Sequence, residues 1–329
     1  MFRFHTSRRY ALRAVAGVAA VLAAGTAIAQ GYPTKPIRLV VPFPPGGAVD
    51  FYARVVQPPL GELLGQTIVI DNKAGASGMV GAEIVAKSPP DGYTLLLGNI
   101  ASLAINVGIY PKMPYDPLKD FTPVVRTVDV NYVLVVHPSL SAKSVAELVA
   151  YAKAHPGKLS YGSAGSGSLP HLGTELFKAR TGTDIVHVPY KGGGPMVTDL
   201  LGGNVQMVIA DQANLMPHVQ SGKLRALAVA TAKRSPNAPD LPTIAEAALP
   251  GFEATAWQGL VGPAGMPPDV VKRLNDAFNK VMAMPAVREK LIGGGLEPVG
   301  GTPEQFGRFI GSEIAQWTKI AKDVGAKAE

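Results

Sequence analysis

The stretch Ile37–Gly61, IRLVVPFPPGGAVDFYARVVQPPLG, runs from an apolar segment through a turn of prolines and glycines into a segment with helical spacing. A strand that ends in a Gly-rich turn and leads into a helix leaves several backbone N–H groups without an intrahelical acceptor. These groups and the helix dipole make such a turn a potential anion site. A tight strand-to-helix turn without a ligand fits the same residues, so this stretch alone leaves both interpretations open.

Strand-like and helix-like segments alternate along the rest of the chain. Short apolar runs bounded by turn residues predict strands, and longer amphipathic segments predict helices. This alternation predicts an α/β fold with largely parallel sheets. The expected strands cover residues 37–41, 66–72, 91–99, 132–138, 159–163, 184–190, 205–211 and 224–231, and the expected helices cover residues 144–157, 169–182, 192–203, 267–295 (with a break at Pro285) and 302–325.

Two widely separated loops share the same character. Pro42–Asp50 and Gly162–Ser168 each follow a strand, are rich in small residues and lead into a helix. Ligands of open α/β sheets bind at the carboxyl ends of strands, beside such loops. The two loops therefore predict a cleft that holds a ligand from both sides.

The first 29 residues read as an export signal. An arginine-rich start without acids precedes an apolar run that ends in Ala27-Ile28-Ala29, a small-x-small cleavage pattern. We expect cleavage after Ala29, because the apolar run is short for a spanning helix; an uncleaved anchor is the alternative. Arg8-Arg9 also fits a twin-arginine signal, so the export route stays open.

Composition excludes several classes of protein. The chain has 329 residues and is 47% hydrophobic, enough for two domains with sizeable cores. It has no cysteine, which excludes disulfides, thiolate metal sites and cysteine nucleophiles. Without residues 1–29 and their four arginines the formal net charge falls from +7 to +3. This excess is too small to indicate nucleic-acid binding.

Known catalytic motifs are absent. The sequence has no G-x-x-x-x-G-K-[ST], and Ser163 and Ser166 lack the glycine spacing of a G-x-S-x-G nucleophile elbow. The six histidines form no close pair on one helix face, so we expect no metal site. The sequence thus predicts neither an enzyme nor a cofactor-binding protein.

Polar side chains beside the second loop are candidates for ligand contact. Ser163, Ser166 and Ser168 supply hydroxyls, His171 lies in the first turn of the next helix, and Asp211 ends a strand. Each has a structural alternative: a solvated loop for the serines, a capping or core role for His171, and a helix cap for Asp211.

Several ordered segments together resemble one family. They are YPTKPIRLVVPFPPGGAVDFYAR, VIDNKAGASGMVGAEIVAKSPPDGYTLLLGN, YDPLKDFTPV, YGSAGSGSLPHLGTELFK, VPYKGGGPMVTDLLGGNVQ, GKLRALAVAT and WQGLVGPAGMPPDVVKRLN. The chain closely resembles the solute receptors of tripartite tricarboxylate transporters, the TctC or Bug-type receptors. The resemblance covers essentially everything after the signal, and the ordered set is far more specific than any one segment.

The resemblance implies a periplasmic binding protein of the type II-like, Venus-flytrap kind, with two α/β lobes and a ligand cleft between them. We expect lobe 1 to contain residues 31–128 and 229–300, lobe 2 residues 129–228, and a C-terminal helix in 301–329 to pack near the hinge. The implied partners are a small organic acid or related small molecule and membrane transporter subunits, with no nucleic acid. The receptor itself is expected to be a monomer.

The resemblance also implies the site. A ligand carboxylate would be held largely by backbone amides and ordered waters between the two loops, with Ala74–Gly78 and Asp211 as secondary walls. Family members often carry a hydroxyl residue at the position of Ala48, so this chain lacks one side-chain donor. The expected ligand-binding residues are Phe43, Pro44, Pro45, Gly46, Gly47, Ala48, Asp50, Ala76, Ser163, Ala164, Gly165, Ser166, Gly167, Ser168, His171 and Asp211.

Two other functions compete with a transport receptor. A sensor for a membrane signalling partner would use the same binding chemistry. A periplasmic hydrolase would need a nucleophile and base, and no such pair is visible in the sequence. Both loops lack Lys and Arg, and Lys191 is the nearest basic candidate. We therefore expect backbone amides, rather than a cationic side chain, to hold the ligand.

Overall fold

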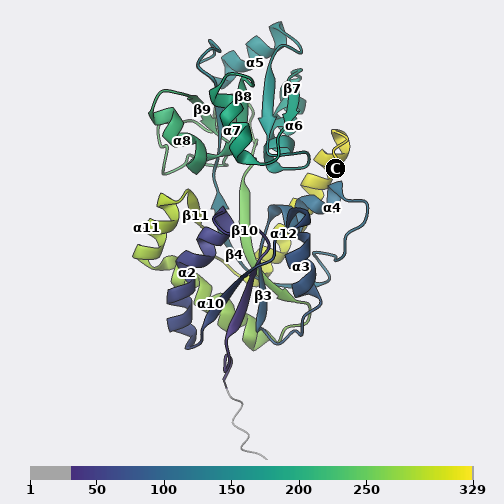
Figure 1. The fold of residues 1–329 in the computed structure, drawn as a ribbon, viewed down its shortest axis with the longest axis vertical. Helices are drawn as coiled ribbons and strands as arrows, with labels where there is room; N and C mark the ends of the chain where they lie inside the picture. Colours follow the sequence, from purple (N-terminus) through teal and green to yellow (C-terminus); the bar gives the residue numbers. More distant parts are fainter. Residues whose placement is uncertain (1–30, 328–329) are drawn as a thin grey trace, which may run out of the picture.

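The computed structural model describes residues 31–327, which form two α/β lobes, each built on its own sheet (Figure 1). The predicted two-lobed fold is confirmed. The predicted export signal lies outside the described residues.

The first lobe is built on a six-stranded sheet with the order β11-β4-β10-β3-β1-β2. β1 pairs in parallel with β2 and β3, whereas β10 runs antiparallel to both β3 and β4. The strands are β1 (Ile37–Val41), β2 (Ile68–Asn72), β3 (Thr94–Asn99), β4 (Phe121–Val130), β10 (Ala256–Pro263) and β11 (Leu296–Pro298).

The second lobe is built on a five-stranded sheet with the order β7-β6-β8-β5-β9. β6 is parallel to β7 and β8, and β5 is antiparallel to β8 and β9. The strands are β5 (Tyr132–Val136), β6 (Ser160–Ser163), β7 (Val186–Pro189), β8 (Met207–Asp211) and β9 (Arg225–Val229).

The expectation of largely parallel sheets is wrong. β4 carries the chain out of the first lobe and leads through Asn131 into β5, and β10 carries it back. Because these two strands cross between the lobes in opposite directions, they pair antiparallel to each other. Each sheet therefore combines a parallel set of strands with antiparallel ones.

Helices cover both sheets. In the first lobe α10 packs on β4 and α2, and in the second lobe α6 packs on β6 and β8. The predicted break at Pro285 is confirmed, because α10 ends before this proline and α11 begins with it. The first lobe carries α2 (Ala48–Leu64), α3 (Met79–Ala86), α4 (Asn106–Ile109), α10 (Pro268–Ala283) and α11 (Pro285–Gly293), with short turns at Ala76–Gly78 and Ala101–Ile105; the second carries α5 (Val145–Ala154), α6 (Leu169–Thr181), α7 (Gly193–Leu201), α8 (Gln212–Gln220) and α9 (Ile244–Ala247).

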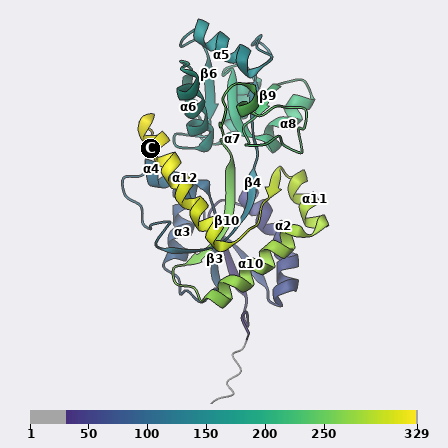
Figure 2. The ribbon, with the colours of Figure 1, turned by 180° about the vertical axis from the view of Figure 1, so that it is seen from behind.

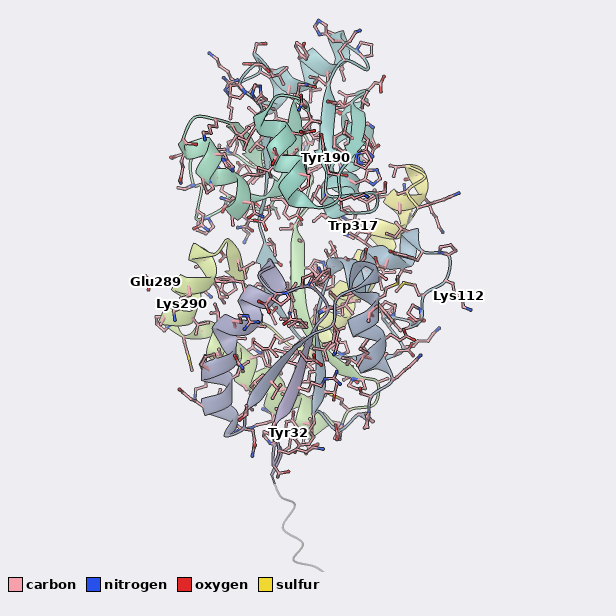
Figure 3. The ribbon with its side chains drawn as sticks, viewed as in Figure 1. Tyr32, Lys112, Tyr190, Glu289, Lys290 and Trp317 are labelled. Atoms are coloured by element: carbon pink, nitrogen blue, oxygen red, sulfur yellow. The ribbon has the colours of Figure 1, made fainter. Side chains whose placement is uncertain are left out.

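The C-terminal helix α12 (Pro303–Asp323) runs from the first lobe toward the second (Figure 2). Its Phe306 packs edge-on against Trp257 of β10, with ring centroids 5.7 Å apart. Glu313 accepts hydrogen bonds from the indole N–H groups of Trp257 and Trp317, at 2.7 and 3.1 Å. Trp317 lies on the part of α12 beside the second lobe (Figure 3), and α12 also contacts α6. Buried indoles thus tie this helix to a crossing strand.

The lobe boundaries stay a prediction, but the contacts after β9 bear on them. The amide of Val229 donates to the carbonyl of Pro242, and that of Ala254 donates to the carbonyl of Ala230. α9 packs on α5 and β9 of the second lobe. These contacts favour a boundary at the start of β10 over one at residue 229.

Candidate functional site

The first Gly-rich loop is held by a buried acid. Asp50 is 2% exposed, and its carboxylate accepts hydrogen bonds from the Gly46 amide (2.9 Å), Arg54 Nε (2.7 Å) and Asn72 Nδ2 (3.0 Å). The hydrogen bond from Arg54, reinforced by the other donors, lowers the pKa of Asp50. Asn72 also donates to the carbonyl of Phe43. Asp50 therefore fixes the loop from beneath, and the Gly46 amide is already bonded inside the loop.

The start of α2 presents backbone amides without a side-chain cap. The N-cap residue Gly47 has extended backbone (φ −81°, ψ 172°) and no side chain to accept a hydrogen bond. Pro44, Pro45, Gly46 and Gly47 are exposed. The amides of Ala48 and the next residue therefore begin a 17-residue helix beside an exposed loop, the arrangement that suits an anion.

The second Gly-rich loop uses most of its polar groups internally. Ser163 is fully buried, and its Oγ accepts from the Gly165 amide (3.2 Å). Ser168 caps α6 by accepting from the His171 amide (3.4 Å), while its own amide donates to the carbonyl of Gly165. The Gly167 amide donates to His171 Nδ1 (3.0 Å). Ala164, Gly165 and Ser166 are half-buried. This loop consequently has fewer amides to give a ligand than its sequence suggests.

A serine–histidine pair that the sequence did not reveal lies under this loop. Ser163 Oγ is 2.7 Å from His187 Nε2. The pair is not visible in the sequence because the two residues are 24 positions apart and meet only where β6 pairs with β7. Ser163 has no exposed surface, so a substrate carbonyl has no access to its Oγ in this conformation.

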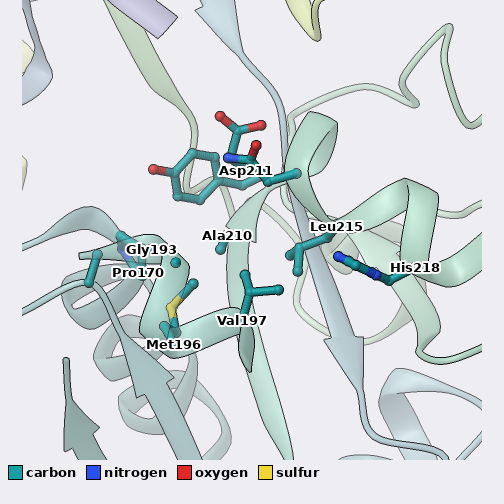
Figure 4. Close-up of a pocket in the computed structure, with 12 residues that line it drawn as sticks. Pro170, Gly193, Met196, Val197, Ala210, Asp211, Leu215 and His218 are labelled. Atoms are coloured by element: carbon teal, nitrogen blue, oxygen red, sulfur yellow. The ribbon is translucent and has the colours of Figure 1, made fainter. Parts of the chain in front are cut away.

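A cavity of about 580 Å³ opens on the second lobe (Figure 4). Of the expected site residues, Ala164 and Asp211 line it, whereas the first-loop residues do not. Asp211 also caps α8 by accepting from the Ala213 amide (2.8 Å), and burial raises the pKa of its carboxyl. Asp211 thus caps α8 and also lines the cavity. The described lining residues include no Lys or Arg; they are Tyr132, Ala164, Pro170, Gly193, Gly194, Met196, Val197, Ala210, Asp211, Asn214, Leu215 and His218.

Most of these lining residues were not expected. Gly193 and Gly194 begin α7 and belong to a further run of glycines, Gly192–Gly194. This run follows strand β7, just as each of the two Gly-rich loops follows a strand. That repeated pattern is the signal that could have identified them. Lys191, two residues earlier, is exposed and does not line the cavity.

The second loop touches the first lobe at α4. Gly167 in the second loop packs against Ile109 of α4, so closely that a Cβ built on this glycine would lie 2.5 Å from Ile109 Cδ1. Ala76 is exposed in the turn before α3, and the neighbouring Gly78 lies against Phe43 of the first loop. Asn106 of α4 donates to the carbonyl of Ser77, so the turn with Ala76 is tied to the helix that the second loop touches.

Residues 31–327 contain neither a metal-binding cluster nor a helix that could span a membrane. No group of three or more His, Asp or Glu side chains within residues 31–327 could hold a metal ion. In the same range no helix is long and apolar enough to cross a membrane.

Comparisons with known proteins agree on one family. Residues 52–326 match the family described as tripartite tricarboxylate transporter family receptor. The chain is 43% identical to protein BugT of Bordetella pertussis over 95% of both chains. It is similar to the structure of R. palustris Rpa4515 with adipate, with 44% identity and a TM-score of 0.79 over 90% of this chain and 99% of the other. It is also similar to MatC of Rhodopseudomonas palustris with bound malate, with 33% identity and a TM-score of 0.74 over 88% and 99%.

Proposed function

The chain belongs to the tripartite tricarboxylate transporter receptor family, and we propose that it captures a small carboxylate between its lobes and delivers it to a membrane transporter. Family members are periplasmic binding proteins. We propose the same location for this chain, reached with the signal in residues 1–29 and after cleavage behind Ala29.

The observation that carries the proposal is the uncapped start of α2. Its first amides lie beside the exposed Gly47, on a loop that Asp50 holds in place. Backbone N–H groups and the helix dipole suit one carboxylate without a cationic side chain. Adipate and malate in the two related structures are both small carboxylates. The cavity on the second lobe would then receive the rest of the ligand.

Binding should be tested on protein freed of any copurified ligand by unfolding and refolding. We expect adipate, or another small acid from a broad panel, to raise the melting temperature. A ligand that binds only the native state stabilises it by about 2.7 kcal/mol at a hundredfold excess over its dissociation constant. Mass spectrometry of the untreated protein would identify the natural ligand. A panel of organic acids without any thermal shift would count against the proposal.

Delivery to a transporter needs a separate experiment. Crosslinking of the ligand-loaded receptor in membranes should capture transporter subunits. Capture of a sensor kinase instead would favour the signalling alternative, which uses the same binding chemistry.

A further inference from the structure

Three stacked rings lie beneath the second loop. His171 of α6 stacks on His187 of β7 with ring centroids 4.1 Å apart and planes 9° apart. His187 in turn stacks on Tyr161 of β6, at 4.9 Å and 18°. Both imidazoles contact the loop: His171 Nδ1 accepts from the Gly167 amide, and His187 Nε2 lies 2.7 Å from Ser163 Oγ. The loop conformation therefore depends on two titratable rings.

The hydrogen bond from Gly167 fixes the protonation state of His171. A ring nitrogen that accepts a hydrogen bond carries no proton, so His171 is neutral with its proton on Nε2. Protonation would turn Nδ1 into a donor that faces another donor. It would also place an imidazolium in a site where the side chain is only 8% exposed. The bond to the loop and the buried stack both oppose the charged form.

The charges around His171 do not reverse this preference. Burial is the largest influence and lowers the pKa of His171; Glu175 acts in the opposite direction, and Lys178 acts in the same direction as burial. The Glu175 carboxylate is already engaged, because it accepts from the Tyr161 hydroxyl and from Lys178 Nζ, each at 2.6 Å. His187 is the titratable group stacked directly on the His171 ring, and Tyr161 stacks on His187 in turn.

We propose that His171 and His187 are positioning residues for the second loop and that the receptor binds its carboxylate only while His171 is neutral. This inference rests on the proposed function. Protonation of His171 releases the Gly167 amide, and the loop loses the conformation that completes the site. Apparent affinity then falls with the neutral fraction of His171. Acidification of the periplasm would reduce capture.

The first test needs no ligand. Nitrogen-15 NMR of the histidine rings in the ligand-free protein should show His171 as the Nε2–H tautomer, with a pKa below that of an unperturbed histidine. An Nδ1–H tautomer, or a pKa at or above the ordinary value, would overturn the positioning role. Because adipate is absent, this result is independent of whether the chain binds carboxylates.

The second test compares variants by calorimetry with adipate. His171→Asn keeps an oxygen acceptor where Nδ1 lies but does not titrate, whereas His171→Leu has no acceptor. Between about pH 7.5 and about pH 5 we expect the wild-type affinity to fall about threefold more than that of His171→Asn. Because adipate titrates identically for both proteins, its own protonation cancels. His171→Leu should bind about tenfold more weakly at either pH, a loss equal to about 1.4 kcal/mol.

A matched control comes from the same lobe. His155 is exposed at the end of α5, so His155→Asn should keep the wild-type pH profile. Equal pH profiles for the wild type and His171→Asn, or tighter wild-type binding at low pH, would overturn the proposal. If no carboxylate binds any variant at any pH, the proposed function fails, while the NMR result still decides the role of His171 in the loop.

Discussion

The two Gly-rich loops look alike in sequence but have opposite hydrogen-bonding arrangements. The first loop leaves the start of α2 without a side-chain cap, and its fixed charge, Asp50, lies beneath it. The second loop leads into a capped helix, and the amides of Gly165 and Gly167 donate to the side chains of Ser163 and His171. The first loop therefore offers hydrogen-bond donors to a ligand, whereas the second loop has a conformation fixed by its internal hydrogen bonds. Two similar loops need not contribute equally to one ligand.

The largest expected effect comes from blocking the first loop. Gly47→Val should weaken adipate binding about a hundredfold or more, or about 2.7 kcal/mol, because the branched side chain covers the amides of Ala48 and Val49. Backbone strain is not the cause: Gly47 has φ −81°, and a Cβ there would meet only the Pro44 carbonyl, at 3.8 Å. The melting temperature should consequently stay near the wild-type value. If calorimetry shows unchanged adipate affinity for Gly47→Val, the first loop does not contact the ligand.

Removing the charge of Asp50 beneath the first loop should have the next largest effect on binding. Asp50→Asn removes the charge that Arg54 and the Gly46 amide bind, so we expect destabilisation of about 1–2 kcal/mol and adipate binding about tenfold weaker. Because the folded-state pKa of Asp50 is lowered, its stabilising contribution is complete above the unfolded pKa and is lost as pH falls through the folded pKa. Urea unfolding at several acidic pH values should show this loss in the wild type.

If Asp50→Asn loses stability but keeps full affinity, the loop does not depend on this acid for its binding conformation. Exposed Asp184→Asn on the second lobe makes the same change in charge and should alter neither property.

Adding a side-chain cap to α2 and removing the one on α6 should have different effects on adipate binding. Gly47→Ser adds a hydroxyl that can accept from the first amides of α2, so it should stabilise the fold by a few tenths of a kcal/mol while weakening adipate binding severalfold. Ser168→Ala removes the cap of α6 and should cost about 1 kcal/mol of stability, with a smaller loss of affinity. Unfolding and calorimetry of both variants are the measurements. Equal losses of affinity in both would mean that the loops contribute alike.

The smallest effect should come from the nearest exposed cation. Lys191→Ala should weaken adipate binding less than tenfold, because Lys191 is exposed and does not line the cavity. A loss of several kcal/mol by calorimetry would point to a direct ion pair with the ligand.

The sequence predicted those features of the fold that are set by residues close to each other in the chain. Most strands, the break at Pro285 and the position of both Gly-rich loops follow from apolar runs, prolines and glycines that are close in sequence, whereas β4, β10 and β11 are not among the expected strands. The partners of the loop atoms could not be predicted, because Asn72 reaches Phe43 and His187 reaches Ser163 only after the strands pair. The antiparallel crossing of β4 and β10 likewise depends on the path between lobes.

The chemistry of the two loops is most directly compared by amide NMR during an adipate titration of ligand-freed protein. The amide protons of Ala48 and Val49 should move downfield as they begin to donate to the carboxylate. Those of Gly46 and Gly167, which already donate to Asp50 and His171, should move little. Saturable shifts confined to the second loop or to Lys191, with Ala48 and Val49 unchanged, would contradict capture of the carboxylate by the first loop.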